Sequence, residues 1–422
     1  MCMLQTVFLL LLLVYHVSDC AGQWQALQTG YGGTVTSVSF TSPDTGFIPA
    51  GNSIYKTVDG GGNWTRYAIE DGNTYELKSI HFPTPEVGYV AGETIYKTTN
   101  SGATWDSLHT LSDRNKGDLS VVKFIRFADE LQGVIGLFGT PLYSQDGGSQ
   151  WEMTGPVFET PSWNSDISFL GGGVAVIGGW NPSFAGDFGM VSRSTNNGET
   201  WSGIPDEQLY FESIQIHTVF FHDALHGWAG GSRMGSGRPY SKWRVMFTTN
   251  GGETWQSPSK ILPKTVNCIQ FANTQVGFVG DEDGGIYSTV DGGVSWSLEN
   301  VETNGRAIED ICIVGNSVYV VGASGLMLKS TIVTDVNEIP ERSVFRIYPN
   351  PSLGRVHVVG SANHSDAHDG VVEVIDSFGR LVYSESMRYT AFTLDLGSLA
   401  KGMYFVRIRS GGHQRTMYLA LI

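Results

Sequence analysis

Cysteine is scarce in this chain of 422 residues, which holds only Cys2, Cys20, Cys268 and Cys312. The first two fall in an N-terminal segment that we expect to be removed. Cys268 and Cys312 fall in two predicted strands, at different heights. A disulfide between them stays open in an oxidising compartment but is not favoured, and we predict two buried thiols.

Positive charge is also scarce, because 26 Lys and Arg residues face 41 Asp and Glu residues. The net charge is −15 and the isoelectric point is near 5.0. No basic stripe is available to neutralise phosphates, so we predict that nucleic acid is not a partner. The 54 glycines indicate turns rather than disorder, since 12% aromatic residues supply a core.

Long apolar runs are missing after residue 21, so the sequence predicts no transmembrane helix there. The run at residues 7–14 is too short to span a bilayer and lies where a signal peptide belongs. We therefore expect residues 1–21 to be a signal peptide. A lipoprotein anchor at Cys20 is disfavoured because Asp19 stands where lipidation sites require a small neutral residue.

What the chain does have is a repeat of the form Ser/Thr-x-Asp/Asn-x-Gly-x-x-Trp, present six times. The tryptophans are 41, 46, 50, 54 and 41 residues apart, the period of a four-stranded propeller blade. The copies are Thr57/Asp59/Gly61/Trp64, Thr98/Asn100/Gly102/Trp105, Ser144/Asp146/Gly148/Trp151, Ser194/Asn196/Gly198/Trp201, Thr248/Asn250/Gly252/Trp255 and Thr289/Asp291/Gly293/Trp296.

Each residue of the repeat suits a hairpin turn. The Asp or Asn oxygen can accept backbone N–H bonds, and the glycine supplies a positive φ. The tryptophan opens the next strand and buries its ring between sheets. We therefore interpret these Asp and Asn residues as turn formers rather than catalytic groups.

A second phrase, Gly-aromatic, precedes four of the six repeats, at Gly46-Phe47, Gly88-Tyr89, Gly227-Trp228 and Gly277-Phe278. The combined pattern predicts four short strands per period, and a seventh unit beginning at Ile308 lacks its last strand. The segment Trp24–Leu27 resembles that missing strand. We predict an all-β fold: a seven-bladed β-propeller over residues 22–333, closed by its N-terminal strand.

The octets resemble the Asp-box (BNR) repeat of sialidases, some glycoside hydrolases and sortilin-type receptors. The fuller phrase around Gly277-Phe278 and Ser288–Trp296 is similar to the photosystem II assembly-factor-like propellers. This resemblance implies the fold and leaves the activity open, because one propeller serves many functions.

The tail resembles the C-terminal sorting domain of the type IX secretion system. The residues that carry the resemblance are Ile347–Pro351, Glu373–Tyr383 and Lys401–Ile408; the lysines that commonly close the family are replaced here by Arg415–Ala420. The resemblance implies the type IX machinery as a partner, and a secreted or outer-surface location reached through the periplasm.

The tail's own pattern predicts a small Ig-like β-sandwich over residues 344–422, joined to the propeller by a polar linker at 334–343. The predicted strands lie near 355–360, 371–375, 381–384, 392–396 and 403–409.

A ligand site is expected where the blades carry insertions, at residues 180–187 and 232–243 in the fourth and fifth blades. Flat contact surfaces would come from Trp180, Tyr240 and Trp243, and donors from Arg233 and Arg238. Ordinary loops that pack on each other remain an equal alternative.

Catalytic and metal motifs are weak. The Arg-Ile-Pro motif of sialidases is absent, and nothing selects a pair among Asp166, Asp187, Asp206, Glu207 and Glu212. His222 and His226 are four apart but fall in a predicted turn, so we predict no metal site and no cofactor.

We therefore expect an exported, non-catalytic binding or assembly protein whose ligand is a protein or a glycan. The alternative is a secreted or surface glycoside hydrolase of the Asp-box propeller type.

Overall fold

The computed structural model describes residues 21–69, 76–110, 122–154, 157, 163–183, 186–203, 214–233, 244–256, 262–332, 346–348, 354–359, 370–376, 380–387, 391–410 and 413–421. The chain divides into two compact units, Met1–Val333 and Thr334–Ile422. The predicted signal peptide, apart from Ala21, and the predicted linker lie outside the described residues. Among the described residues no helix is long and apolar enough to cross a membrane.

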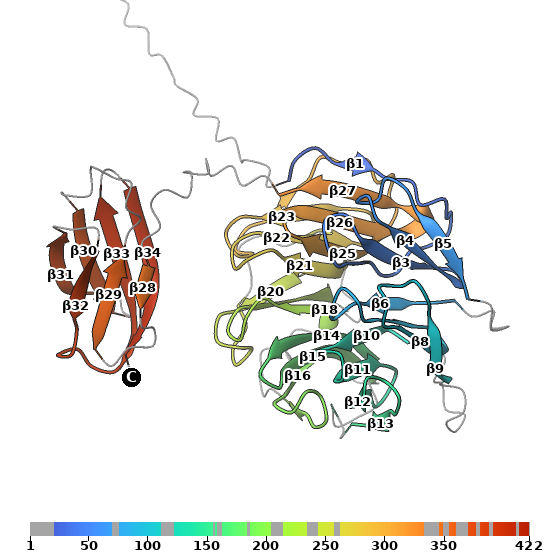
Figure 1. The fold of residues 1–422 in the computed structure, drawn as a ribbon, viewed down its shortest axis with the longest axis horizontal. Coiled ribbons are helices and arrows are strands. Elements are labelled where there is room, and N and C mark those ends of the chain that lie inside the picture. Colours follow the sequence, from blue (N-terminus) through green and yellow to red (C-terminus); the bar gives the residue numbers. More distant parts are fainter. Residues whose placement is uncertain are drawn as a thin grey trace, which may run out of the picture. The chain divides into compact units, whose positions relative to one another are not determined.

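The described residues of the first unit form seven small antiparallel sheets (Figure 1). We call them blades one to seven, and letter the strands of each blade A to D from the inside outward. Blade one contains β2 (Ser39–Phe40), β3 (Gly46–Ala50), β4 (Ser53–Thr57) and β5 (Thr65–Ala68). Blade two contains β6 (Ser79–His81), β7 (Gly88–Ala91), β8 (Thr94–Thr98) and β9 (Asp106–Thr110). Blade three contains β10 (Phe124–Phe127), β11 (Gly133–Gly136), β12 (Leu142–Ser144) and β13 (Glu152–Met153).

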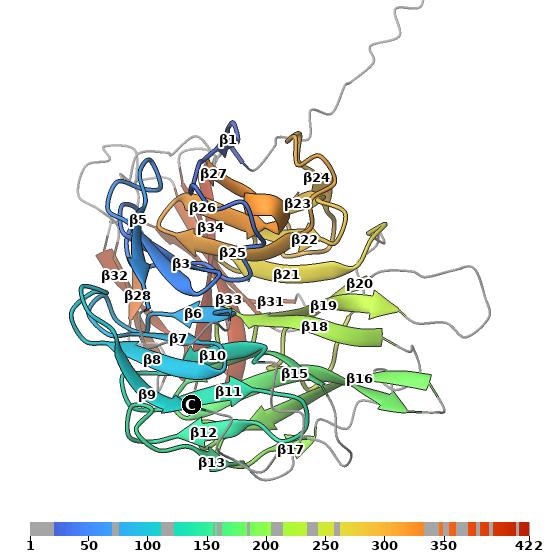
Figure 2. The ribbon, with the colours of Figure 1, turned by 90° about the vertical axis from the view of Figure 1, so that its right-hand side faces the viewer.

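The remaining blades follow the same order, as the turned view in Figure 2 shows. Blade four contains β14 (Trp163–Gly171), β15 (Val174–Ser183), β16 (Gly186–Ser194) and β17 (Ser202–Gly203). Blade five contains β18 (Ile214–Phe221), β19 (Gly227–Arg233) and β20 (Arg244–Thr248), with a single bridge from Phe247 to Gln256 in place of strand D. Blade six contains β21 (Val266–Phe271), β22 (Gly277–Asp281), β23 (Ile286–Thr289) and β24 (Ser297–Leu298). Blade seven contains β25 (Ile308–Val314), β26 (Ser317–Gly322), β27 (Met327–Thr331) and β1 (Gln25–Ala26), with the 3₁₀ turn η2 (Ala323–Gly325) before β27.

The ring is closed by the N-terminal strand. Gln25 pairs with Lys329 and Ala26 with Leu328, and Ala21 bridges to Ile332. The Trp24 indole Nε1 also donates a hydrogen bond to Glu299 in the neighbouring blade, at 3.1 Å. The prediction of a seven-bladed propeller closed by Trp24–Leu27 is confirmed.

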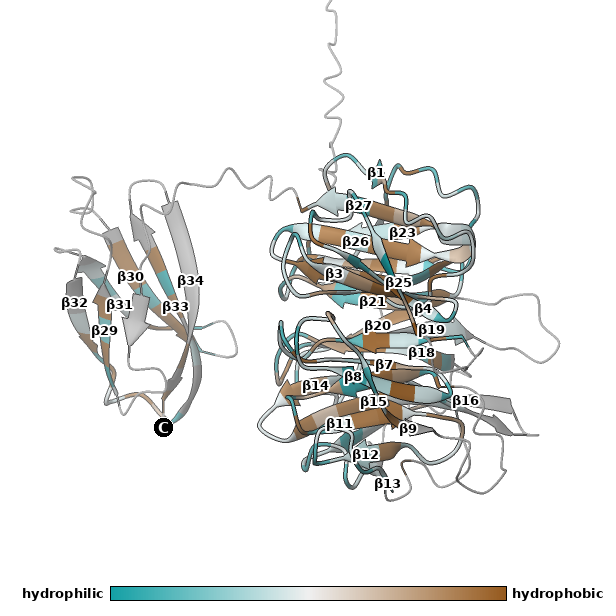
Figure 3. Ribbon diagram, turned by 45° about the vertical axis from the view of Figure 1, so that its right-hand side comes forward, coloured by the Kyte–Doolittle hydropathy of each residue, from teal (hydrophilic) through white to brown (hydrophobic). Residues whose placement is uncertain are grey.

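Aromatic rings join most blades to the next. Phe82 directly follows strand A of blade two, stacks on Phe47 of blade one at 4.0 Å, and meets Trp105 of its own blade edge-on at 5.8 Å. The same arrangement recurs at Phe40, Phe127 and Phe271. The aromatic residues of the Gly-aromatic phrase and the repeat tryptophan thus build the core between the sheets. Figure 3 shows hydrophobic residues, in brown, along many strands of the blades.

The second unit contains two described sheets. One contains β28 (Arg346–Tyr348), β29 (Arg355–Val359) and β32 (Ala391–Asp395). The other contains β31 (Leu381–Met387), β30 (Gly370–Asp376), β33 (Gly402–Ser410) and β34 (His413–Leu421). Val356 and Leu394 of the first sheet share one buried cluster with Val374 and Val406 of the second, as in a sandwich.

The predicted strands of the tail are all present, but the prediction missed two. It missed β28, which is only three residues long, and it missed β34 although Gly411-Gly412 ahead of that strand is a two-residue hairpin signal. The segment Arg415–Ala420, which departs from the family's ending, lies inside β34.

Candidate functional site

The propeller has two faces with different connections. Leu77, which precedes strand A of blade two, donates its N–H to the Gly51 carbonyl in the turn between strands B and C of blade one. Gly60, in a repeat turn, donates to the Asp44 carbonyl in an A–B turn. The B–C turns and the segments that lead into strand A lie on one face, which we call the B–C face. The repeat turns and the A–B turns lie on the other, which we call the Asp-box face.

The repeat turns are held by hydrogen bonds within each repeat. Thr57 Oγ1 donates to Asp59 Oδ1 at 2.8 Å and accepts from the Gly61 N–H at 2.9 Å. Hydrogen bonds from Asn63, then from Thr57, lower the pKa of Asp59 to about 2. The other five copies make the same two bonds, so the prediction that these residues form turns is confirmed.

The predicted ligand site is described only in part. Trp180 lies in β15, half-buried. Arg233 ends β19, and its side chain lies outside the described residues, as do Arg238, Tyr240 and Trp243 entirely. The expectation of a loop at 180–187 is corrected: Trp180 to Ser183 pair with Gly189 to Gly186, so the insertion is a lengthened hairpin.

Trp180 belongs to a row of aromatic rings on the B–C face. It stacks with Trp163 of β14 at 6.3 Å, and Trp163 contacts Phe138 of blade three at 4.7 Å. Lys123 Nζ lies 5.4 Å from the centre of the Trp163 ring. We call Phe138, Trp163 and Trp180 the aromatic row. Sequence reasoning missed Phe138, Trp163 and Lys123, because Trp163 lies outside the repeats and is placed by cross-strand pairing with Trp180.

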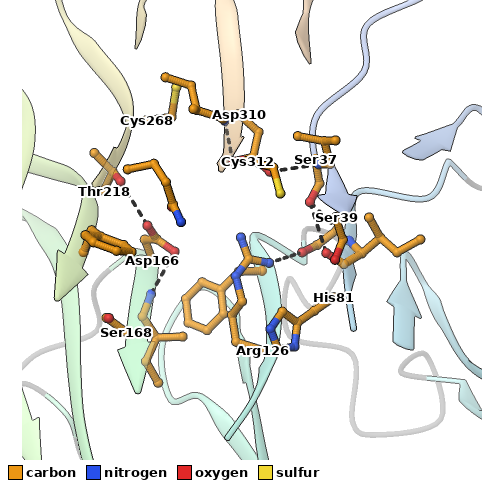
Figure 4. A pocket seen from close by; sticks show the side chains of 18 of the residues that line it. Ser37, Ser39, His81, Arg126, Asp166, Ser168, Thr218, Cys268, Asp310 and Cys312 are labelled. Atoms are coloured by element: carbon orange, nitrogen blue, oxygen red, sulfur yellow. Dashed lines mark hydrogen bonds between the residues drawn. The ribbon is translucent and has the colours of Figure 1, made fainter. Parts of the chain in front are cut away.

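The A strands of all seven blades line a central cavity of about 520 Å³ (Figure 4). Several of its polar residues form hydrogen bonds with the next blade. Asp166 Oδ2 accepts hydrogen bonds from Thr218 Oγ1 at 3.0 Å and from the Val219 N–H at 3.2 Å. Asp310 Oδ2 accepts from the Val38 N–H at 2.9 Å and so joins the last blade to the first.

Burial shifts the titration of the groups that face this cavity. It raises the pKa of Asp310 to about 6, although Arg126 acts in the opposite direction. It also raises the pKa of Asp166 and lowers that of His81 to about 3. At neutral pH His81 is therefore uncharged. Cys268 and Cys312 line the same cavity and are free thiols; Cys268 is buried as predicted, whereas Cys312 is half-buried.

No paired catalytic carboxylates emerge from the candidates that the structure describes. Asp166 is engaged with the backbone of blade five, while Asp206, Glu207, Glu212 and the Asp187 side chain lie outside the described residues. The histidine pair His222 and His226 forms an A–B turn, in which the His222 N–H donates to the His226 carbonyl. No group of three metal-ligating side chains is found in the described part of the chain.

Two family models match the chain. Residues 17–126 match the photosynthesis system II assembly factor YCF48, and residues 346–420 match the secretion system C-terminal sorting domain. The chain therefore combines a YCF48-type propeller with a sorting domain, and the resemblances noted in the sequence are confirmed. No curated protein matches the chain significantly.

Solved structures agree on the fold. YCF48 bound to D1 peptide is 17% identical, with a TM-score of 0.55 over 73% of this chain and 96% of that one. YCF48 from Cyanidioschyzon merolae is 17% identical, with a TM-score of 0.58 over 73% and 98%. Virginiamycin B lyase from Staphylococcus aureus is 11% identical, with a TM-score of 0.58 over 74% and 99%. At these identities the likeness shows the propeller alone, which hosts both binding proteins and enzymes.

Proposed function

We propose that this chain is a non-catalytic binding or assembly protein that is delivered to the cell surface or the medium by its sorting domain. The C-terminal match implies export through the type IX machinery. The observation that carries the binding role is the aromatic row beside Lys123, which offers flat apolar surfaces next to a cation. One of the matching structures, YCF48, is bound to a peptide, which supports a protein ligand here.

The points at which the chain enters and leaves the propeller support a ligand site on the B–C face. Strand β27 runs from the B–C side to the Asp-box side, so the chain leaves the propeller after Ile332 on the Asp-box face. The N-terminal strand begins there too, since Ala21 bridges to Ile332. The described part of the propeller therefore begins and ends on the Asp-box face, and the B–C face carries neither end.

Capture of partners by the purified full chain tests the proposal. We expect the wild-type protein to retain a surface protein or a glycan, and Trp180→Ala to weaken that binding about tenfold or more, as for an aromatic hot spot. Arg66→Ala on outer strand β5 is the matched control and should bind normally. Equal binding by the Trp180 variant and the wild type would contradict the assignment of this face.

The alternative is a glycoside hydrolase. The observation that favours it is the pair of cavity-facing aspartates, Asp166 and Asp310, whose pKa values are both raised. Glycosidases use two carboxyl groups about 5 to 10 Å apart. Chromogenic glycosides separate the two functions: turnover that Asp310→Asn or another single carboxylate change abolishes would replace the binding proposal with the enzyme.

A further inference from the structure

One layer of the central cavity is rich in hydrogen-bond donors. In blades one to four it consists of the residue directly before a phenylalanine at or near the end of strand A. These residues are Ser39, His81, Arg126 and Ser168, all of which line the cavity. Figure 4 shows these four side chains around one space, with Arg126 projecting between the strands.

One lone pair of each serine hydroxyl already accepts a hydrogen bond from the next blade. Ser39 Oγ accepts the Phe82 N–H at 3.3 Å, and Ser168 Oγ accepts the Phe221 N–H at 3.0 Å. Neither hydroxyl makes a further hydrogen bond as donor among the described residues. Each hydroxyl hydrogen therefore remains to be donated to a molecule in the cavity.

His81 also offers a donor, because its acceptor nitrogen is already occupied. Its Nδ1 accepts the Phe127 N–H at 3.1 Å, so in the neutral ring this nitrogen holds no proton. The proton must then sit on Nε2. Because burial keeps the ring neutral, His81 offers an N–H rather than a second charge.

Arg126 supplies the positive charge of this layer. Its Nη1 donates to Ser79 Oγ and to the Ile125 carbonyl, both at 3.0 Å. Within the described residues those are its hydrogen bonds, and no carboxylate there is ion-paired with it. The other guanidinium nitrogens make no hydrogen bond among the described residues and can donate to a molecule in the cavity.

We propose that Ser39, His81, Arg126 and Ser168 form a binding site for a small oxyanion inside the propeller, a carboxylate or phosphate group. Arg126 supplies charge and a planar pair of donors, and the other three supply neutral donors around it. This site is separate from the aromatic row, so it stands or fails independently of the proposed function.

The acidic residues of the neighbouring layer set the pH dependence of such a site. Asp166 and Asp310 face the same cavity, with Glu309, Lys123 and His217 toward its B–C end. Protonation of Asp310, whose pKa is about 6, removes repulsion of an anion. Oxyanion affinity should therefore rise as pH falls from 7 to 5.

Calorimetric titration of the full chain tests the site with two probes, inorganic phosphate and citrate, at constant ionic strength. We expect at least one to bind, and Arg126→Gln to weaken that binding about tenfold or more. The control is Arg66→Gln on strand β5, where the same charge is lost far from the cavity. The probe that binds identifies whether the site takes phosphates or carboxylates.

A second variant keeps the test decisive if Arg126→Gln does not fold. Ser168→Ala leaves Arg126 in place and should weaken oxyanion binding about three- to tenfold. The proposal is overturned if the wild type binds neither probe at millimolar concentration. It is also overturned if the folded variants bind as tightly as the wild type.

Discussion

At the scale of single residues, a missing Cβ decides how closely the strands and rings approach. Gly88 begins strand B of blade two, directly beneath the ring of Phe82, and a Cβ placed there would overlap that ring. The ring cannot move aside, because Phe47 stacks on it and Trp105 meets its edge. The glycine of the Gly-aromatic phrase is therefore required by packing.

We predict that Gly88→Ala lowers the free energy of unfolding by about 1–3 kcal/mol, the usual cost of overpacking a core. Urea unfolding of the two proteins measures the difference. Gly32→Ala is the control, since Gly32 is exposed and has open space around its Cα, and it should stay within about 0.5 kcal/mol of the wild type. Equal stability of the two variants would refute the packing explanation.

The pKa of Asp310 gives a second prediction at this scale. In the folded chain it is raised to about 6 from an unperturbed 3.8, so the folded state binds the proton more tightly than the unfolded state. The stability from this group is present below pH 3.8 and lost as pH rises through about 6. Burial also raises the pKa values of Asp166 and Glu309, so their contributions to stability change with pH in the same direction.

Asp310→Asn should therefore weaken the decline in the free energy of unfolding between pH 4 and pH 7, because the amide has no proton to lose over that range. Chemical denaturation of both proteins across the same range provides the measurement. Identical pH profiles for variant and wild type would show that Asp310 does not titrate as described.

At the scale of elements, the short strand β1 completes the ring. Without it, the edge of β27 would expose unpaired backbone groups, a template for association with other chains. The same junction is reinforced by Tyr319, whose hydroxyl donates to the Pro43 carbonyl at 2.7 Å, and by the stacking of Tyr319 on Phe40. Closure therefore uses both a strand and a packed aromatic contact.

Removing residues 22–27 should lower the melting temperature of the propeller and promote oligomers, which light scattering after size-exclusion chromatography detects. The control is the larger deletion of residues 344–422. Because the second unit has its own buried cluster, this deletion should leave propeller melting unchanged. A monomeric N-terminal deletion with wild-type melting would contradict the role of β1.

The elements also show what sequence can and cannot predict. The repeats predicted six of the seven blades because each combines a turn residue, a positive-φ glycine and a core tryptophan, all local requirements. The seventh was predicted from the strand pattern after Ile308 and the matching N-terminal segment Trp24–Leu27. The aromatic row was missed because Phe138 and Trp163 meet between two blades, which no local pattern encodes. The cavity layer was missed for the same reason: Ser39, His81, Arg126 and Ser168 become neighbours only when the ring closes.

At the scale of the whole molecule, we assign export to the second unit and binding to the first. The second unit matches a sorting domain, and in the first unit both described chain ends lie on the Asp-box face, opposite the B–C face. Deleting residues 344–422 should leave the protein in the periplasm, which immunoblotting of periplasm, surface and medium would reveal. Trp180→Ala should be exported like the wild type, and export of the truncated chain would contradict this assignment.

We propose above that the B–C face binds the partner. Hydrogen–deuterium exchange of the full chain, with and without the captured partner, tests it most directly. We predict slower exchange in β14, β15 and their B–C connections, with unchanged exchange in the six repeat turns. Protection confined to the repeat turns, such as Thr57–Trp64, would contradict the claim.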